Sequence, residues 1–193
     1  FLYLLLAFFL FRLGRVVAIS MLTLYGLVNI YYTVKVVGYW QQSAAIVTGL
    51  INNIPAAQGK TVLILNSPEY LNGVPIIGPF WHFSFGKMRN LYLDNPVDTA
   101  VYEVVSYNLL SAGDGAHVNV VNDSVLHVTL NQWGTWWWIG MWGAHNYETK
   151  DYKLNLIDPG HWYELTLKKP ASNYLLLYQV GSQWKVVDMG KKD

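Results

Sequence analysis

The stretch "VVAISMLTLYGLVNIYYTVKVV", from Val16 to Val37, is mostly apolar and carries a single charge, Lys35. As an α-helix, with a rise of about 1.5 Å per residue, it is roughly 33 Å long. The hydrocarbon core of a bilayer is about 30 Å thick, so this length is sufficient to cross it. Aromatic residues, which prefer the headgroup layer, stand near its end at Tyr31, Tyr32, Tyr39 and Trp40. The sequence therefore predicts a membrane-spanning helix.

A second apolar run, "FLYLLLAFFLF", occupies residues 1–11, just before the pair Arg12 and Arg15. It is too short to cross a bilayer, which takes about 20 helical residues. A signal peptide places its positive charge before the apolar run, whereas here both arginines follow it. By the positive-inside rule, the arginines predict a cytoplasmic turn. We expect a transmembrane helical hairpin over residues 1–37, with a truncated first helix that continues upstream. A soluble protein with a buried apolar hairpin is the alternative.

Residues 38–58 continue with helical spacing and predict an amphipathic connecting helix. This helix is expected to end at Pro55 and the Gly59 turn. Its predicted apolar face consists of Trp40, Ala44, Val47, Ile51 and Ile54.

Beyond Gly59 the apolar period changes from helical to two, which is typical of strands. The fold class expected is a membrane-anchored α+β protein, with a β-rich extracytoplasmic domain over residues 59–190. Gly, Asn, Asp and Pro separate the predicted strands. These are 61–65, 99–110, 117–121, 124–130, 135–142, 152–157, 162–167, 174–180 and 183–188.

Composition excludes several classes of function. The formal net charge is +1, whereas a nucleic-acid-binding domain usually has a strongly basic face. There are no cysteines, which excludes disulfides and thiolate chemistry. Neither apolar run contains a histidine that would hold a haem, so we expect no cofactor. No serine-nucleophile motif, phosphate-binding loop or carboxylate pair is recognisable, so the sequence predicts no catalytic or metal site in this chain.

The segment "NQWGTWWWIGMWGAHNY", residues 131–147, contains a tryptophan cluster with three interpretations. Tryptophans can fill a core or a protein contact, anchor at the membrane interface, or form a platform for glycans. We expect burial, because strand alternation would send adjacent indoles to opposite faces. The interaction candidates are Trp133, Trp136, Trp137, Trp138 and Trp142.

Five histidines remain to be explained: His82, His117, His127, His145 and His161. A hairpin with its turn at Asn122 and Asp123 would place His117 and His127 together on its polar face. Zinc takes three or four protein ligands, so these two are predicted to be exposed strand residues.

The stretch "TVLILNSPEYLNGVPIIGPFW", preceded by "YWQQSAAIVTGLINNIP", resembles the last part of bacterial polytopic membrane proteins related to lipid-linked-sugar glycosyltransferases. The matching residues are Trp40, Ala44, Leu65, Asn66, Pro68, Glu69 and Gly73. The resemblance covers roughly residues 16–85, and Ser67 departs from it where an apolar residue is expected. It implies that the catalytic residue lies in an early loop outside this chain, so none is carried over.

The residues themselves leave two interpretations of the loop expected at Asn66, Pro68, Glu69 and Gly73. Asn66 can close an Asx turn, Pro68 holds its neighbour extended and Gly73 permits the return. Alternatively, a loop at the carboxyl end of a strand is where open α/β sheets bind ligands.

These observations predict a C-terminal, membrane-anchored domain of a bacterial envelope protein, in the inner membrane with its main domain periplasmic. Its expected role is docking, recognition or stabilisation. Expected partners are the lipid bilayer, other membrane subunits or the upstream part of the same chain, and a glycan; nucleic acid is not expected. The alternative is an accessory subunit of a respiratory or photosynthetic membrane complex.

Overall fold

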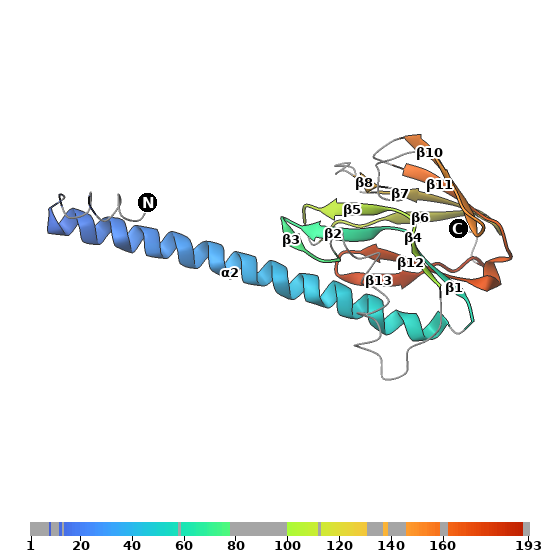
Figure 1. The fold of residues 1–193 in the computed structure, drawn as a ribbon, viewed down its shortest axis with the longest axis horizontal. Coiled ribbons are helices and arrows are strands. Elements are labelled where there is room, and N and C mark those ends of the chain that lie inside the picture. Colours follow the sequence, from blue (N-terminus) through green and yellow to red (C-terminus); the bar gives the residue numbers. More distant parts are fainter. Residues whose placement is uncertain are drawn as a thin grey trace. The chain divides into compact units, whose positions relative to one another are not determined.

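The computed structural model describes residues 8, 12, 14–57, 59–77, 100–111, 113–130, 137–138, 146–158 and 162–190. The chain forms two compact units, Phe1–Gly38 and Tyr39–Asp193. A single helix, α2 (Arg15–Asn53), supplies residues to both (Figure 1). It continues through residues 37 and 38, where the sequence suggested two successive helices. Glycine is tolerated within a helix at a cost of about 1 kcal/mol, and Gly38 does not interrupt α2.

The described part of the first unit is the N-terminal portion of α2, together with Phe8, Arg12 and Gly14. Its apolar side chains are exposed all around the helix, with Val16 77% and Val34 68% accessible. This helix is long and apolar enough to span a membrane. Of residues 1–11 only Phe8 is described, so the predicted first helix lies outside the described residues.

The second unit contains three sheets, and the β-rich prediction is confirmed. Sheet A has the order β13 (Gln183–Val186), β12 (Tyr174–Val180), β1 (Thr61–Ile64) and β4 (Val101–Glu103). Sheet B has the order β3 (Val74–Pro75), β2 (Ser67–Leu71), β5 (Ser106–Leu109) and β8 (Trp137–Trp138). Sheet C has the order β6 (His117–Asn122), β7 (Val125–Thr129), β11 (Trp162–Leu167), β10 (Tyr152–Asp158) and β9 (Tyr147–Glu148). Two 3₁₀ turns are η1 (Ile54–Ala57) and η2 (Ala171–Asn173).

Two parallel strand pairs connect sheets A and B. β1 pairs in parallel with β4, and β2 pairs in parallel with β5. The segments β1–β2 and β4–β5 both pass from sheet A to sheet B, and they stay hydrogen-bonded to each other between the sheets. Val104 N donates to Ile64 O at 2.8 Å, and Ser67 N donates to Val105 O at 2.7 Å. The region predicted as a single strand over 99–110 is therefore two strands, β4 and β5. Likewise, Pro68 and Glu69 lie in strand β2 and not in the predicted loop.

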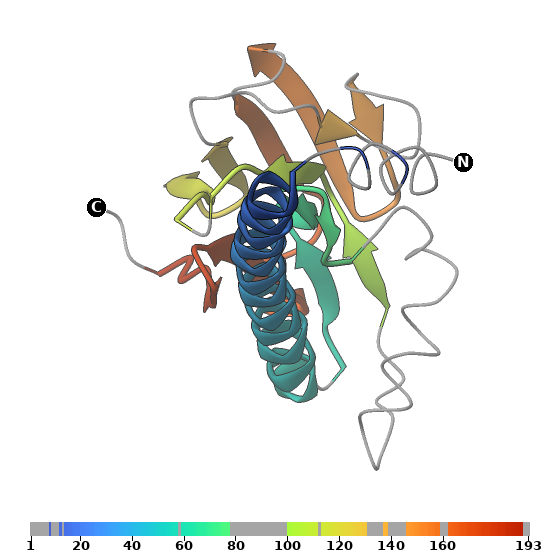
Figure 2. The same cartoon turned by 90° about the vertical axis from the view of Figure 1, so that its left-hand side faces the viewer.

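Sheet C is antiparallel throughout and covers the core with one face. In β11 the exposure alternates, so Tyr163 and Leu165 are fully buried while Trp162 and Glu164 are partly exposed. The Tyr163 hydroxyl donates to Leu65 O at 2.5 Å, which joins sheet C to the end of β1. In both views β10 and β11 (orange) lie on the opposite side of this unit from β12 and β13 (red) (Figure 2).

The C-terminal part of α2 packs within the second unit. Its buried face includes Ser43, Ile46 and Leu50, whereas Trp40, which was predicted to lie on the apolar face, is 52% exposed. Ala44, predicted beside it, is also exposed. The helix is rotated because Ser43, a polar residue, is satisfied inside: its hydroxyl donates to Pro75 O at 2.6 Å. Trp184 Nε1 donates to Ile46 O at 2.7 Å and links β13 to the helix.

The β6–β7 hairpin turns one residue later than predicted. Asn122 pairs with Val125, which leaves Asp123 and Ser124 in the turn. The Asn122 side chain oxygen accepts from Ser124 N at 2.9 Å, so this asparagine closes an Asx turn.

Candidate functional site

Asn66 follows the end of β1, and its side chain forms the hydrogen bonds with β12 that the backbone of a neighbouring strand would form. Asn66 Nδ2 donates to Gln179 O at 2.9 Å, and Asn66 Oδ1 accepts from Gln179 N at 2.7 Å. The last pair of β1 with β12 is Ile64 with Leu177, so the backbone of Gln179 extends past the end of β1. The carboxamide therefore continues the ladder, where an Asx turn was predicted. Because buried backbone groups must be paired, Asn66 fixes the junction between the sheets.

Tyr107 completes this buried network. Its hydroxyl donates to Gln179 Oε1 at 2.5 Å and accepts from Asn66 Nδ2 at 3.2 Å. Burial raises the pKa of Tyr107 above its ordinary value, so the hydroxyl remains a donor at neutral pH. All three side chains are almost completely buried, and the network acts as a structural clamp.

Two carboxyl groups lie at the same junction. The register of β2 with β5 shifts between Pro68 and Tyr70, so Glu69 is the additional residue of a β-bulge, a feature that redirects side chains. Glu69 is only 7% exposed. Burial raises the pKa of Glu69, although a hydrogen bond with Ser106 opposes the shift.

Glu103, the last residue of β4, is the second carboxyl group. Burial is the main cause that raises the pKa of Glu103 to about 8. Hydrogen bonds with the hydroxyls of Ser67 and Ser106 lower the pKa, and the negative charge of Glu69 raises it further. Ser67 and Ser106 face each other in the pairing of β2 with β5. With a pKa of about 8, Glu103 is protonated at neutral pH and can donate a hydrogen bond.

Sequence reasoning identified Glu69 but missed its partners. Glu69 and Glu103 are distant in sequence, and only the parallel pairing of β1–β2 with β4–β5 brings them together. Glu103 follows "AVY" in a segment predicted as an ordinary alternating strand. A signal existed in the two serines at matching strand positions, but the register that aligns them was unknown from sequence.

Gly73 has the conformation that a tight return requires. Asn72 and Gly73 have φ values of 47° and 81° and connect β2 to β3. Positive φ at both central residues is typical of a type I′ hairpin turn. Asn72 Nδ2 also donates to Leu110 O at 2.7 Å, which ties this turn to the end of β5.

The tryptophan cluster is only partly described. Trp133, Trp136 and Trp142 lie outside the described residues. The backbone of Trp137 and Trp138 forms β8, which pairs antiparallel with β5 and so borders the junction. The predicted burial of these indoles stays a prediction.

The two described histidines lie on one face of sheet C, on neighbouring strands. His127 Nε2 is 3.2 Å from Glu164 Oε2, and His117 is exposed. Among the described residues no three His, Asp or Glu side chains are grouped to hold a metal ion. His82, His145 and His161 lie outside the described residues.

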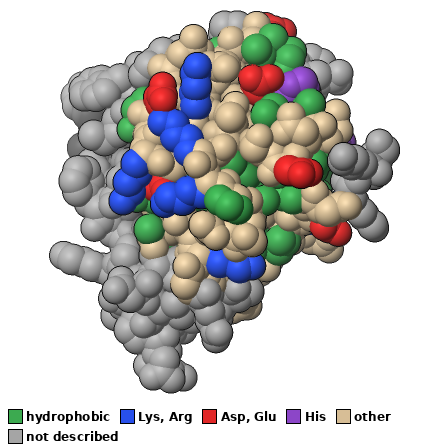
Figure 3. Space-filling model, turned by 90° about the vertical axis from the view of Figure 1, so that its right-hand side faces the viewer, with side chains coloured by type: hydrophobic (Ala, Val, Ile, Leu, Met, Phe, Trp, Pro, Cys, Tyr) green, Lys and Arg blue, Asp and Glu red, His purple; other side chains and the backbone are tan. Residues whose placement is uncertain are grey.

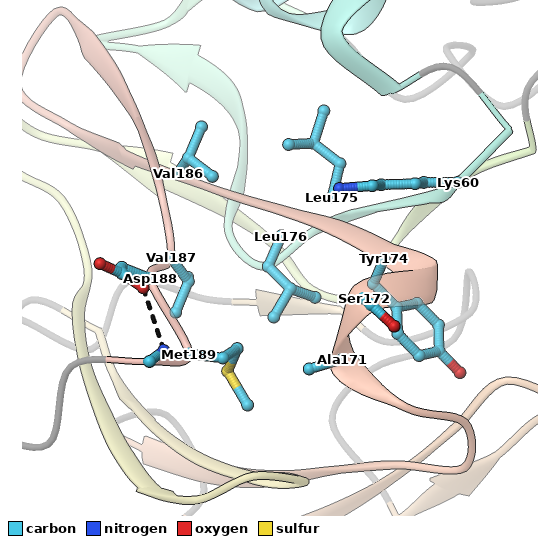
Figure 4. A pocket seen from close by; sticks show the side chains of 11 residues that line it. Lys60, Ala171, Ser172, Tyr174, Leu175, Leu176, Val186, Val187, Asp188 and Met189 are labelled. Carbon is cyan, nitrogen blue, oxygen red and sulfur yellow. Dashed lines mark hydrogen bonds between the residues drawn. The ribbon is translucent and has the colours of Figure 1, made fainter.

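A hollow of about 270 Å³ opens at the amino ends of β1 and β12. Figure 4 shows Lys60 extending along one end of this pocket, with Leu176 and Val187 on its walls. The Asp188 carboxylate accepts from Gly190 N at 3.0 Å. None of the residues that the sequence singled out lines this pocket.

On the face shown in Figure 3, most of the lysine and arginine side chains (blue) gather toward one side. Two lysines of this unit are neutralised by acids: Lys168 Nζ lies 2.6 Å from Glu148 Oε1, and Lys169 Nζ lies 2.6 Å from Asp151 Oδ1. Such pairing lowers the local positive potential.

No family model, no curated protein and no solved structure matches this chain.

Proposed function

We propose that this chain is a membrane-anchored, extracytoplasmic β-rich domain of a bacterial envelope protein resembling glycosyltransferases. In this proposal its role is docking, recognition or stabilisation, with the anchor in the inner membrane and the β-rich unit on the periplasmic side. The observation that carries the proposal is the exposure of apolar side chains all around the N-terminal part of α2.

Exposure of this kind is unfavourable in water. Apolar surface costs about 25 cal/mol per Å² to leave in water, and a helix that is apolar all around is typical of a buried or membrane-spanning segment. Among the described side chains of this part of α2, the charges are Arg15 and Lys35. At about 1.5 Å per residue these charges are roughly 30 Å apart, which matches the thickness of the hydrocarbon core.

Aromatic side chains support the position of the outer boundary. Tyr31 and Tyr32 form an edge-to-face contact with ring centroids 5.4 Å apart, and both are about 60% exposed. Tyrosines of this kind favour the headgroup layer. The arginines at the other end support a cytoplasmic location for residues 12–15.

Cysteine labelling tests both the anchor and its orientation. The chain has no native cysteine, so single substitutions give a clean signal. Gly14→Cys introduces a side chain with no neighbour within 4 Å, and Ser182→Cys lies in the exposed β12–β13 turn. In intact spheroplasts, an impermeant thiol reagent should label Ser182→Cys at once and Gly14→Cys only after lysis.

The reversed labelling pattern would contradict the proposed orientation. Recovery of the protein in the soluble fraction after an alkaline carbonate wash would contradict the anchor itself. Sedimentation of the labelled protein with outer-membrane markers would contradict the inner-membrane location.

A further inference from the structure

The outer face of sheet C carries an ordered row of polar side chains. Because β7 buries Leu126 and Val128, strand alternation places His127 on the opposite, solvent-facing side. The side chains of His127 and Glu164 retain 34% and 29% of their accessible surface. This face is therefore reachable from solvent.

The row crosses four neighbouring strands in register. Asn119 of β6 faces His127 of β7, His127 faces Glu164 of β11, and Glu164 faces Asn155 of β10. Glu164 is held from both sides: its Oε2 lies 3.2 Å from His127 Nε2, and its Oε1 accepts from Asn155 Nδ2 at 3.4 Å. With strands about 4.8 Å apart, the row is roughly 14 Å long.

An aromatic side chain borders this row. Trp162 lies two residues before Glu164 on the same strand face, and its ring centroid is 5.0 Å from that of His127, at an interplanar angle of 57°. Trp162 is partly exposed. Its cross-strand neighbour is Thr129, which in turn faces His117. On the side of β10, Trp162 pairs with Asp158. The second row therefore adds one indole, one hydroxyl, one imidazole and one carboxyl group.

We propose that this outer face of sheet C binds a neutral oligosaccharide chain. A sugar ring has an apolar face of C–H groups, which can stack on the indole of Trp162, and hydroxyls that both donate and accept. The row offers hydrogen-bond acceptors and donors to these hydroxyls: the Glu164 carboxylate accepts, and the carboxamides of Asn119 and Asn155 both donate and accept. Its length suits several linked sugar units. The proposal extends the proposed recognition role by naming a ligand, and it does not depend on the membrane anchor.

The charge and composition of the face favour this ligand over others. The acidic residues are Glu164 in the first row and Asp158 in the second, and both oppose an anionic ligand. At the paired positions of the two rows Trp162 is the one large apolar side chain, and Ile157, which is 50% exposed, lies in the bulge of β10 next to Asp158. Protein interfaces instead concentrate several apolar and aromatic anchors at their centre. The row is therefore better suited to an uncharged, polyhydroxylated molecule.

Calorimetric titration of the full chain in detergent tests the proposal. The probes are neutral tetrasaccharides of β-1,4-linked glucose, α-1,4-linked glucose, β-1,4-linked N-acetylglucosamine and β-1,4-linked mannose, with tetragalacturonate as the anionic probe. At least one neutral probe should bind, and tetragalacturonate should bind at least tenfold more weakly. Trp162→Ala and Glu164→Gln should each lower the affinity for the neutral probe at least tenfold.

The matched control is Lys153→Ala, an exposed position on the same face one row away, opposite Thr166, which should change affinity less than twofold. If Trp162→Ala does not fold, Glu164→Gln and Asn155→Ala decide the question. Binding unaffected by these substitutions, a preference for tetragalacturonate, or no binding of any neutral probe would overturn the proposal. None of these results bears on the labelling pattern, so the two proposals can fail separately.

Discussion

Glu103 should govern how the stability of the second unit depends on pH. Its folded-state pKa of about 8 is above the ordinary value of 4.5, so between these two values the folded state holds a proton that the unfolded chain has lost. Stability is then fully present below pH 4.5 and falls as the pH rises to 8. At about 1.4 kcal/mol per pKa unit, the loss is a few kcal/mol.

Glu103→Gln should remove most of this loss, and the midpoint of thermal unfolding at pH 5 and pH 8 measures it. Glu148→Gln serves as the control, because Glu148 is exposed and should leave the pH dependence unchanged. Equal stability of the unmodified protein at both pH values would contradict the prediction.

Tyr107→Phe should destabilise the junction of sheets A and B. The substitution leaves Gln179 Oε1 without its donor in a fully buried place, and an unsatisfied buried group costs about 1–3 kcal/mol. Denaturant unfolding measures the loss. The control is Tyr178→Phe on β12, a partly exposed tyrosine whose hydroxyl makes no hydrogen bond among the described residues. A loss equal to that of the control would mean that the clamp adds nothing.

Asn66 shows what single residues could and could not reveal beforehand. Its position after an apolar strand predicted a role in ending that strand, and β1 ends two residues before it, at Ile64. Its partner, Gln179, could not be inferred, because an asparagine bonds equally well to its own turn and to a distant backbone. The choice depends on β12 extending past β1, which is a property of the sheet.

At the scale of elements, the loop before β6 is packed directly against β12. A Cβ at Gly115 would lie 2.5 Å from Val180 Cα and 2.8 Å from Gln179 O, so backbone would have to move. Gly115→Ala should therefore cost about 3 kcal/mol or more, at the upper end for overpacking. Gly113→Ala in the same loop meets its nearest atom at 3.8 Å and should be nearly neutral. The denaturant midpoints of the two variants measure this difference in stability, and similar midpoints would contradict the close approach of Gly115 to β12.

Strand alternation made several elements predictable. β11 and β12 occupy the predicted ranges 162–167 and 174–180. β11 alternates in burial, whereas β12 begins with a continuous buried apolar run, and turn residues bound both. β2 was missed because Asn66, Ser67 and Pro68 together are typical of a turn, and only its pairing with β5 makes the segment extended. The apolar face of α2 was misplaced because a buried serine is invisible to a hydrophobic pattern.

For the whole molecule, a shortened chain should not fold. A second unit that ends after Pro170 lacks β12, the strand at the centre of sheet A that pairs with both β1 and β13. β1 would lose its neighbour β12 along its whole length, which would expose its buried side chains, including Leu63 and Ile64. Limited proteolysis should digest this truncated chain rapidly, whereas a chain shortened only to Gly190 should resist like the full one. Equal resistance would contradict the central role of β12.

The α+β class and the apolar helix could be predicted because they depend on local composition and period. The division into three sheets could not, since it depends on parallel pairings between distant segments. The carboxyl pair follows from the same pairings. It stays hidden until β2 and β4 are known to meet at one bend.

The pairing of β1 with β12 also determines when sheet A can form during translation. Thr61 pairs with Tyr174, so the ribosome makes β1 and its other neighbour β4 long before β12 exists. Long-range parallel pairing of this kind forms slowly, and uncovered strands are prone to aggregate in the meantime. If the second unit is exported as proposed, the delay is useful, because a translocation channel passes unfolded chain most easily.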